Sequence, residues 1–413
     1  MRLRTERLAE HTKAPPVTAE CGVRVVSDYD SFLALEPVWN ALVEEARIGY
    51  PFLRHEWVRT WWECFGEDHE LYVLEVKVRG QTAAIAPLML SHAWIYGLPV
   101  RRLALIGNAH TYRCDLIVTR QPVDAYWAIW DHLRSIAHRW DLLELSQVPA
   151  GSRTLDELPR LAARDGFQVN VRHLGDSPYI PLRGSWGQYV QGLRSKHRAN
   201  LRNRIKRLNA LGTVSVEEVS TPDRLAAALV DGFRIEAAAW KGRARSAIGS
   251  RPELRRFYTR LAERAVERGW LRLQFLTVNG RRIAFAYSLC AEDKLYLLKP
   301  GYEPAYAPFS PSHLLCYLVL QNAYASGLAE YDLLGVADDW KLAWTKDARP
   351  HYRLSIFPNR LRPMLLYTAK FRLVPPASRA RAWARAALQA FRHGTAEAVG
   401  ERRGWRKAPG RRR

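Results

Sequence analysis

A strand–turn–strand pattern that occurs twice constrains this sequence more than any other feature. Residues 71–90 (LYVLEVKVRGQTAAIAPLML) and 271–290 (LRLQFLTVNGRRIAFAYSLC) each read as an alternating strand, a tight turn and a second apolar strand. The turn is Arg-Gly in the first stretch and Asn-Gly in the second, ending at Gly80 and Gly280. We therefore expect one hairpin at corresponding places in each half of the chain.

A second correspondence lies downstream of each hairpin. A helical stretch there leads into a short strand that contains an aspartate, in HRWDLLELSQVP around Asp141 and in AEYDLLGVAD around Asp332. The interval from the turn glycine to that aspartate is 61 residues in the first half and 52 in the second. A duplicated α/β unit explains both correspondences economically, and chance similarity of two hairpins is the alternative.

Helical patterns surround these strands. Mixed polar and apolar residues recur with a spacing near 3.6, and several of the stretches follow Asp, Ser or Thr. The predicted helices are residues 30–46, 55–65, 123–139, 222–239 and 253–268. Helices and strands mixed in this order indicate an α/β (α+β) fold.

Composition divides the chain into five parts. Pro and Gly gather between the two halves, and Arg and Ala dominate after Pro358. The parts are a flexible basic start (1–20), a first α/β domain (21–150), a linker (151–176), a second α/β domain (177–360) and a basic tail (361–413).

The net charge of +22 is concentrated in three segments. Residues 361–413 carry 14 Lys/Arg against two Glu, a charge of +12, and residues 177–216 carry eight Lys/Arg and no acid. Residues 1–14 carry four basic and two acidic residues, so the remainder of the chain sums to zero. Basicity therefore belongs to one helix and two tails, and the globular body has an ordinary charge balance.

The basic helix is predicted near residues 186–208. Apolar residues and one histidine form a stripe along it, and seven Lys/Arg without an intervening acid fill much of the rest. Such a face can attract a polyanion: CoA phosphates, tRNA, an anionic lipid surface or an acidic saccharide. A solvated charged face is the alternative. Arg194 and Lys196, at its start, are candidate substrate-binding residues.

Compartment follows from what the sequence lacks. There is no apolar run of 18 residues, and the first twenty residues have no apolar middle of a secretory signal. Five scattered cysteines form no C-x-x-C pair, which suits a reducing compartment. We expect a cytoplasmic protein. The tail segment SRARAWARAALQAFRHG suits an anionic membrane surface, so peripheral association with the inner membrane face is a further expectation, with a solvated tail as the alternative.

An ordered series of motifs in the second half points to a family. The motifs are SWGQYVQGLRSKHRANLRNRIKRL, EAAAWKGRARSAI, FY at 257, NGRRIAFAY, LKPGYEPAYAPFSPSHLL and YDLLGVADDWKLAWT. Over residues 180–357 the series resembles the CelD/BcsL-type acetyltransferase domain of the GNAT superfamily, and more distantly the Fem-type aminoacyl-transferases. The first half matches more loosely through PFLRHEWVRTWW and RGQTAAIAPL. The resemblance implies two tandem GNAT-like domains, each a mixed sheet flanked by helices, and acyl transfer to an amine.

The resemblance also implies acyl-CoA as a co-substrate, with no tightly bound cofactor. GNAT enzymes hold the CoA pyrophosphate on N–H groups at the start of the helix after a splayed strand. The corresponding turn is APFSPSHLL, which makes Ser310, Ser312 and His313 the candidate donor-binding residues. The chain has no G-x-G, and Pro311 lacks an N–H, so a modified acyl-CoA site, another acyl carrier and a plain capped core helix are all open readings.

Two residues are the catalytic candidates. Asp332 ends the strand EYDLLG, where a carboxylate can orient an amine and accept its proton, or cap a turn or pair with an arginine. Lys341, in DDWKLAWT, can hold a phosphate or a carboxylate, or lie in solvent beside two aspartates. The resemblance places a lysine at this point of the family.

Further candidates concern the substrates. WKGRARSAIG has the glycines of a mobile loop over a cleft, although a plain surface connection is nearly as well supported. Aromatic residues near Pro304 and in DDWKLAWT suit a groove wall or the core. The added candidates are Trp240, Lys241, Tyr302, Tyr306 and Trp344.

Three functions compete. The first is a GNAT-type N-acyltransferase in which an amine on a small molecule, sugar or peptide attacks acyl-CoA directly in a ternary complex. The second keeps the fold but takes aminoacyl-tRNA as donor. The third is a non-catalytic adaptor at a membrane surface or in polysaccharide assembly. No H-E-x-x-H or Cys/His ligand spacing occurs, so no metal site is expected.

Overall fold

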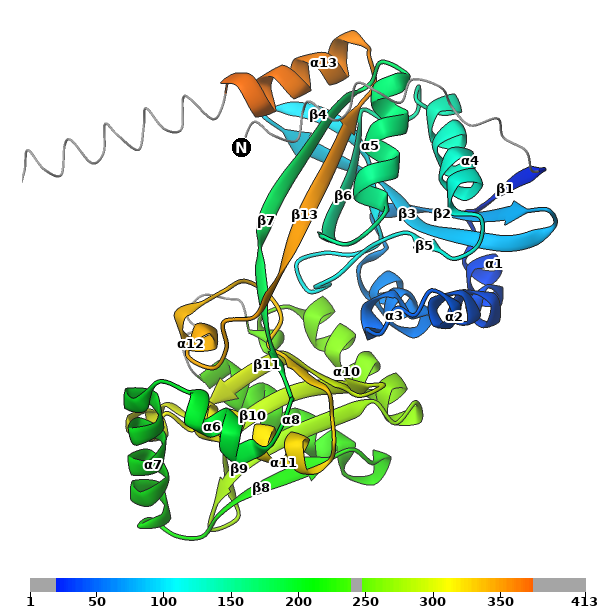
Figure 1. The fold of residues 1–413 in the computed structure, drawn as a ribbon. Coiled ribbons are helices and arrows are strands. Elements are labelled where there is room, and N and C mark those ends of the chain that lie inside the picture. The colour runs from blue at the N-terminus through cyan, green and yellow to red at the C-terminus, as the bar shows by residue number, and fades with distance from the viewer. Residues whose placement is uncertain (1–19, 239–246, 374–413) are drawn as a thin grey trace, which may run out of the picture.

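Two α/β lobes are stacked one above the other and joined by two long strands (Figure 1). This computed structural model describes residues 20–238 and 247–373. Its thirteen strands form one continuous sheet in the order β1-β2-β3-β4-β6-β13-β7-β12-β11-β10-β9-β8, with β5 paired to β3. The expected fold class, two tandem units that each contain a mixed sheet flanked by helices, is confirmed.

The upper lobe, called the N-lobe, contains the first half of the chain. Its elements are β1 (Cys21–Val26), α1 (Tyr29–Ala34), α2 (Glu36–Glu45), η2 (Pro51–Leu53), α3 (His55–Phe65), β2 (His69–Val78), β3 (Gln81–Ile95), β4 (Leu98–Leu105), β5 (Ile117–Val118), α4 (Pro122–Ser135), β6 (Leu142–Pro149) and α5 (Thr154–Arg164). Helices α4 and α5 cover one face of its sheet, and α1 to α3 cover the other.

The lower lobe, called the C-lobe, repeats this plan. Its elements are α6 (Trp186–Gly192), α7 (Ser195–Asn209), β8 (Val214–Val219), α8 (Pro222–Ala238), η3 (Ile248–Ser250), α10 (Pro252–Glu267), β9 (Leu271–Val278), β10 (Arg281–Ala291), β11 (Lys294–Tyr302), η4 (Pro304–Phe309), α11 (Pro311–Ala325), β12 (Glu330–Asp332) and α12 (Asp339–Leu342). Helices α6, α7 and α11 cover one face of its sheet, and α8 and α10 the other.

Both predicted hairpins are present. Strand β2 pairs antiparallel with β3, and β9 pairs antiparallel with β10. Both turns have two residues with positive φ: 51° at Arg79 and 76° at Gly80, then 49° at Asn279 and 78° at Gly280. Two positive φ angles are what a type I′ hairpin turn requires. The five predicted helices are also confirmed, the first of them divided into α1 and α2.

The connection between the lobes differs from the expected linker. Residues 151–176 form α5 and most of β7 (Gln168–Pro181), and β13 (Ala348–Phe357) returns to pair with both β7 and β6. The glycines that suggested a linker mark bends instead: Gly166 (φ 82°) follows α5, and Gly175 (φ 153°) lies in β7 where its pairing with β13 shifts register.

Two further predictions need correction. The single helix expected near 186–208 is two helices, because Leu193 and Arg194 have extended backbone between α6 and α7. The predicted tail beginning at residue 361 is partly folded: α13 (Leu361–Thr368) and η5 (Ala369–Leu373) pack on the N-lobe through Leu366, Tyr367 and Phe371. Tail residues 374–413 lie outside the described part.

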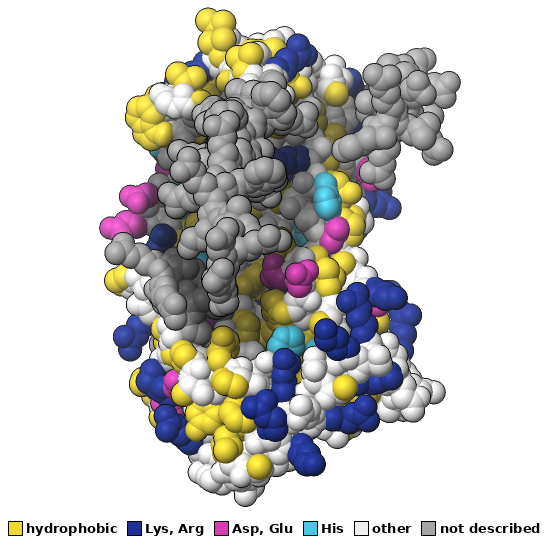
Figure 2. Space-filling view, turned by 90° about the vertical axis from the view of Figure 1, so that its left-hand side faces the viewer, with side chains coloured by type: hydrophobic (Ala, Val, Ile, Leu, Met, Phe, Trp, Pro, Cys, Tyr) yellow, Lys and Arg dark blue, Asp and Glu magenta, His cyan; other side chains and the backbone are white. Residues whose placement is uncertain are grey.

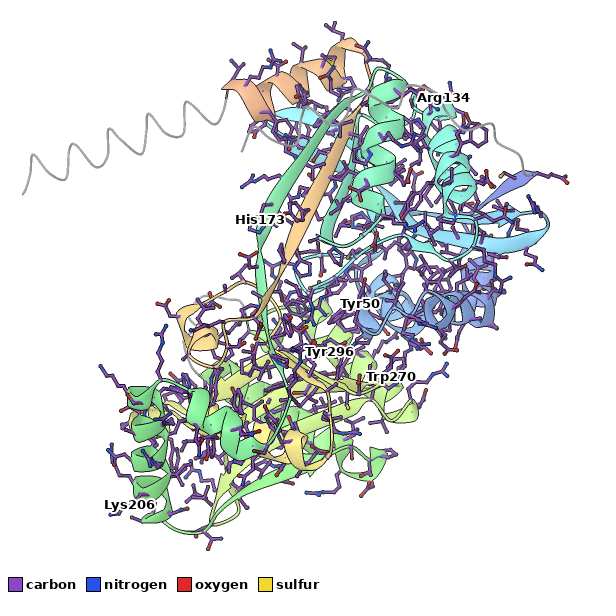
Figure 3. All side chains as sticks on the ribbon, viewed as in Figure 1. Tyr50, Arg134, His173, Lys206, Trp270 and Tyr296 are labelled. Atoms are coloured by element: carbon purple, nitrogen blue, oxygen red, sulfur yellow. The ribbon has the colours of Figure 1, made fainter. Side chains whose placement is uncertain are left out.

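One apolar core runs through the junction of the lobes. Trp57 of α3 packs edge-to-face on Phe257 of α10, with 5.5 Å between the ring centroids. Tyr50 and Tyr296 approach this junction from opposite lobes (Figure 3), and Arg113 lies over both rings at 5.6 and 5.9 Å. The shared core fixes the N-lobe against the C-lobe, which allows N-lobe residues to contribute to a C-lobe site.

Candidate active site

The candidate site begins where two parallel strands of the C-lobe part. Strands β11 and β12 pair at only three positions, the last being Tyr296 with Asp332, and β11 then continues alone on that side to Tyr302. Against β10 on its other side, β11 skips one residue, Leu298. Such a bulge bends its strand, and bulges are frequent beside active sites. The bend and the short β12 together open the sheet.

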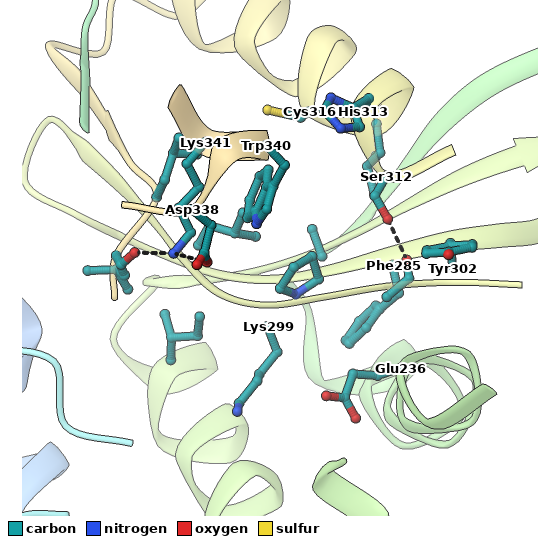
Figure 4. A pocket seen from close by; sticks show the side chains of 18 of the residues that line it. Glu236, Phe285, Lys299, Tyr302, Ser312, His313, Cys316, Asp338, Trp340 and Lys341 are labelled. Atoms are coloured by element: carbon teal, nitrogen blue, oxygen red, sulfur yellow. Dashed lines mark hydrogen bonds and ion pairs between the residues drawn. The ribbon is translucent and has the colours of Figure 1, made fainter. Parts of the chain in front are cut away.

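A cavity of about 440 Å³ occupies this opening (Figure 4). Apolar residues of β10 and β11 form much of its wall, including Phe285 and Leu297, and α11, α12 and α8 close it from three sides. The polar groups are few and come from different elements. They include Glu236, Lys299, Ser310, Ser312, His313 and Lys341. A mostly apolar cavity with a few convergent polar groups is typical of a small-molecule site.

The start of α11 forms one end of the cavity, and the donor-binding candidates Ser310, Ser312 and His313 all line it. Ser310 has φ 48° and ψ 59°, and its carbonyl accepts from the N–H groups of His313 (3.0 Å) and Leu314 (3.2 Å). The Ser312 hydroxyl donates to the Gly301 carbonyl at 3.4 Å. This end of α11 presents the positive end of a fifteen-residue helix to the cavity.

His313 is a neutral side chain at this end of the cavity. Its ring stacks on Trp344, with 5.9 Å between centroids, and meets the His197 ring of α7 at 5.8 Å. Burial, aided by the positive charge of Arg204, lowers the pKa of His313 to about 4. His313 therefore offers no positive charge at neutral pH, only a ring nitrogen.

Glu236 of α8 lies on the opposite side of the sheet from Ser312 (Figure 4). It is fully buried, and its Oε2 accepts from the Ile248 N–H at 2.9 Å. Gly301 of β11 permits this placement, because a Cβ at that position would lie 2.5 Å from the Glu236 Cα. The close approach of α8 to β11 thus positions a carboxylate at the cavity.

The N-lobe supplies the next part of the wall. Tyr112, in the loop after β4, reaches across the junction and donates its hydroxyl to the Leu298 carbonyl at 2.9 Å. Beside it, Lys299 lies 5.5 Å from the Tyr258 ring centroid, and His110 Nδ1 is 3.2 Å from the Tyr258 hydroxyl. Burial, with Lys299 and Arg251 nearby, lowers the pKa of His110 to about 4. The bulged residue of β11 is therefore held by the other lobe.

The catalytic candidate Lys341 lines the cavity and is buried, so it does not lie in solvent. Its Nζ donates to the carbonyls of Leu334 (2.7 Å) and Val336 (2.9 Å) and lies 3.5 Å from Asp338 Oδ2. These contacts fix the loop that follows β12. Lys341 thus has two roles: it holds the loop that forms part of the cavity wall, and it places a cation beside the cavity.

Asp332 is placed differently from the prediction. It is fully buried, forms an ion pair with Arg113 of the N-lobe and a second with Arg349 at 3.3 Å, and does not line the cavity. Its other oxygen accepts from the Leu334 N–H at 2.9 Å. One carboxylate oxygen is therefore committed to the two arginines and the other to a backbone N–H of its own lobe, and we do not retain a catalytic role for Asp332.

The expected match between Asp141 and Asp332 is also wrong. Each lobe has a parallel ladder of three pairs, β4 with β6 and β11 with β12. Asp332 occupies the third position of its ladder, and Glu144 occupies that position in the N-lobe. Asp141 precedes β6 and accepts from the Arg101 backbone N–H (3.0 Å) and guanidinium. The sequence similarity between the two strands therefore aligns residues that are three positions apart in the structure.

The remaining candidates divide into three groups. Tyr302 lines the cavity, whereas Tyr306 does not. Trp344 is buried behind His313, and Arg194 and Lys196 are exposed at the start of α7, outside the cavity wall. Trp240 and Lys241 lie outside the described residues.

Three residues of the site escaped sequence reasoning. Glu236 carried a signal, since it shares the apolar stripe of α8 with Leu229 and Phe233. Lys299 carried a weaker one, as a lysine inside the apolar strand KLYLLKPGY. Tyr112 had none, because its place depends on how the two lobes pack.

The family comparison agrees with this geometry. Residues 195–342 match the family model described as an acetyltransferase (GNAT) domain. The C-lobe therefore contains a GNAT-type domain. The matched segment runs from the start of α7 to the end of α12 and so contains Glu236, β11, β12 and the start of α11.

Solved structures with a similar arrangement share little sequence with this chain. A crystal structure of FemX is 12% identical, with a TM-score of 0.49, 74% of this chain covered and 92% of that one. The C-terminal domain of a putative lysylphosphatidylglycerol synthetase from Agrobacterium fabrum is 11% identical, with a TM-score of 0.49 and coverage of 82% and 96%. A tandem GNAT protein from the clavulanic acid biosynthesis pathway is 13% identical, with a TM-score of 0.44 and coverage of 83% and 100%. No curated protein matches the sequence.

Within residues 20–238 and 247–373, no three His, Cys, Asp or Glu side chains gather as a metal ion would need. In the same ranges, no helix combines the length and apolar character needed to cross a membrane.

Proposed function

We propose that this chain is an N-acyltransferase that moves an acyl group from acyl-CoA to an amine. The observation that carries the proposal is the cavity at the parting of β11 and β12, with the start of α11 at one end and Glu236 across the sheet. A thioester lying in the gap would place its carbonyl beside β11, whose edge beyond Tyr296 pairs on that side with no strand among the described residues. Donor and acceptor would then approach the carbonyl from opposite ends.

In the proposed reaction, the amine nitrogen attacks the thioester carbonyl directly. A C–N bond forms, the C–S bond breaks, and Glu236 accepts the proton that the attacking amine loses. Positioning two substrates in one cavity can supply roughly 7–11 kcal/mol of the barrier, so no covalent enzyme intermediate is required. Lys299, which lines the cavity together with Glu236, would bind an anionic group on the acceptor.

The departing thiolate also needs a proton. Three tyrosines line the cavity, and the Tyr112 hydroxyl is bonded to a backbone carbonyl while Tyr331 is fully buried. Tyr302 is partly exposed and lies beside Ser312 (Figure 4). We assign Tyr302 as the acid that protonates the thiolate.

The phosphate groups of the donor would lie outside the cavity, along α7. This helix flanks the donor end, since His197 contacts His313 and Arg207 lies 5.1 Å over the Phe309 ring. Lys and Arg side chains gather on the lower half of the face in Figure 2, over α7, which carries six of them and no acid. With Arg194 and Lys196 at its start, α7 suits the phosphates of CoA.

The same basic face favours a second donor, an aminoacyl ester of tRNA. The phosphate backbone of tRNA carries more phosphates than CoA and would contact more of α7. Binding of tRNA would therefore weaken steeply with salt. Arg202→Glu with Arg204→Glu should abolish tRNA binding if tRNA is the donor. If acetyl-CoA no longer stabilises this variant, and the wild-type protein does not bind tRNA, then acyl-CoA is the donor. We place either reaction in the cytoplasm, a setting that the five unpaired cysteines suit.

Ligand-induced stabilisation tests the proposal. Saturating acetyl-CoA at about 100 times its Kd should stabilise the protein by about 2.7 kcal/mol, measured as a rise in Tm. Ser312→Trp should fill the donor end and abolish the rise. Ser326→Trp, at the exposed far end of the same helix, should retain it. An unchanged Tm of the wild-type protein with acetyl-CoA and longer acyl-CoAs would contradict the acyl-CoA proposal.

A further inference from the structure

Exposed apolar side chains are concentrated at one end of the N-lobe. Of thirteen large hydrophobic side chains that are exposed among the described residues, six lie in two short segments. Three belong to the β3–β4 hairpin and three to α13 and η5. We call these six residues the apolar ridge: Trp94, Tyr96, Leu98, Leu361, Leu365 and Leu373.

The two segments of the apolar ridge are held together by buried neighbours. Ile95, between Trp94 and Tyr96, packs into the same small cluster as Leu366, Tyr367 and Phe371. The exposed members are prominent: Trp94 keeps 75% of its surface in solvent and Leu361 keeps 80%. The hairpin tip and α13 therefore lie together at one edge of the N-lobe, because their inward-facing residues share a core.

Positive charge accompanies the apolar ridge. Residues 92–102 and 360–373 contain six Lys/Arg and no Asp or Glu. Four of these cations contact the carboxylates of Asp141 and Glu144, while Arg362 and Arg372 are exposed on the helical segment. Figure 2 shows hydrophobic and Lys/Arg side chains side by side at this upper end of the molecule.

We propose that the apolar ridge docks on an anionic lipid bilayer. Trp and Tyr favour the boundary between headgroups and acyl chains, and the leucines would enter the outermost apolar layer. Arg362 and Arg372 would meet lipid phosphates, each contributing a further attraction to a negative surface. An exposed apolar edge with two exposed arginines and no acid within its two segments complements a negatively charged, deformable surface.

The chain beyond the apolar ridge has matching charge. Leu373 is the last described residue, and 40 residues follow it, with eleven Lys/Arg against two Glu. Leu373, to which those residues are attached, belongs to the apolar ridge. Any bilayer that attracts them is thereby brought to Trp94 and Leu361, so the charge outside the structure favours lipid over a second copy of this equally basic chain.

Vesicle flotation of the full-length protein tests the proposal. We expect flotation with vesicles of phosphatidylcholine containing 30% phosphatidylglycerol and little with phosphatidylcholine alone. Trp94→Ser with Tyr96→Ser should lower the partition coefficient about tenfold, and each positive charge removed by Arg362→Gln or Arg372→Gln should lower it about fivefold. Leu211→Ser with Val230→Ser, exposed on the C-lobe, is the matched control and should leave it unchanged.

Each alternative gives a distinct result. Equal flotation of the wild-type protein and the ridge variants would overturn the proposal, and so would no flotation at all. A lipid-free dimer that Trp94→Ser with Tyr96→Ser converts to monomer would show that a second copy covers the ridge. All substitutions are at exposed positions, so an unchanged Tm is the check that each variant is folded. Acetyl-CoA stabilisation is measured separately and does not affect the outcome.

Discussion

The two lobes contain the same gap in their sheets, but only the C-lobe leaves it open. In both, a parallel ladder of three residue pairs ends and the strands part. In the C-lobe, β11 runs six residues further and η4 carries the chain away, which leaves the cavity. In the N-lobe, β4 ends one residue after its ladder, and the following loop folds back against β6, where the Cys114 N–H donates to the Gln147 carbonyl at 3.1 Å.

In this molecule, the segment after the parting strand decides whether the gap in the sheet stays open as a cavity or is filled by the chain itself. The N-lobe loop that closes its own gap also sends Tyr112 and Arg113 into the C-lobe. Tyr112 holds the bulge in β11, and Arg113 pairs with Asp332 at the end of β12. The closed lobe thus helps to keep the other lobe open.

The largest expected effect concerns the open gap. Glu236→Gln removes the proposed base while keeping its volume, and kcat should fall by about 10²–10⁴. Glu253→Gln, an exposed position on α10, should leave kcat unchanged. Steady-state kinetics with acetyl-CoA and an accepted amine measure both. A loss below about tenfold for Glu236→Gln would remove this residue from the mechanism.

The next largest effect concerns the ion pair between the two lobes. Arg113→Met leaves the buried Asp332 with only the partly exposed Arg349 as its charged partner, so the free energy of unfolding should fall by about 3–5 kcal/mol. Arg120→Met breaks an exposed pair with Glu45 in the same lobe and should leave the free energy of unfolding almost unchanged. Urea denaturation measures both values. Equal costs would mean that the inter-lobe pair is no more important than a surface pair.

A pH effect of intermediate size should come from the strand that links the lobes. Burial and the nearby Arg113 lower the pKa of His351 in β13 to about 4, below its value of about 6.5 in the unfolded chain. Between these values the unfolded chain binds more protons, so acidification from pH 6.5 to 4 lowers the free energy of unfolding, by up to roughly 3 kcal/mol for this residue.

His351→Gln should flatten that dependence, whereas His173→Gln, at an exposed position on β7, should not. Asp115 responds with opposite sign, because burial raises its pKa to about 6. Comparing each variant with the wild-type protein at every pH cancels that contribution. An unchanged slope for His351→Gln would contradict the assignment.

The smallest effect sharpens the comparison of the hairpins. Both turns have positive φ at a residue other than glycine, Arg79 in the N-lobe and Asn279 in the C-lobe. Asn adopts this conformation more readily, so Arg79→Asn should raise the free energy of unfolding and Asn279→Arg should lower it, each by on the order of 1 kcal/mol. The change in the free energy of unfolding should be larger for Asn279→Arg, because this variant also loses the hydrogen bond that the Asn279 Oδ1 accepts from the Thr213 N–H at 2.9 Å. Thermal or urea unfolding gives the two signs, and the same sign for both would refute this account.

Local patterns predicted much of the fold and one end of the site. The turn glycines and apolar alternation located both hairpins, and Pro311 with its neighbouring serines located the start of α11. Ser310, Ser312, His313, Tyr302 and Lys341 all line the cavity. These features depend on residues close together in the chain, where turn and helix preferences act directly.

Long-range pairings could not be predicted in the same way. Asp332 pairs with Arg113, 219 residues earlier, which no local pattern indicates. The break between α6 and α7 lies within a continuous amphipathic stripe, so periodicity alone gave one helix where Arg198 instead binds the carbonyls of Gln191 and Leu193. The apolar ridge also could not be predicted, because it is formed by a hairpin and a helix that are more than 250 residues apart in the chain.

The return of β13 to the N-lobe has a consequence for synthesis. Strand β13, at residues Ala348–Phe357, lies between β6 and β7, so the N-lobe sheet lacks an interior strand until almost the whole C-lobe has been translated. Before then the nascent chain exposes the bonding edges of β6 and β7, which invite mispairing. A ribosome-bound chain of this protein should therefore depend on chaperones until its last strand emerges.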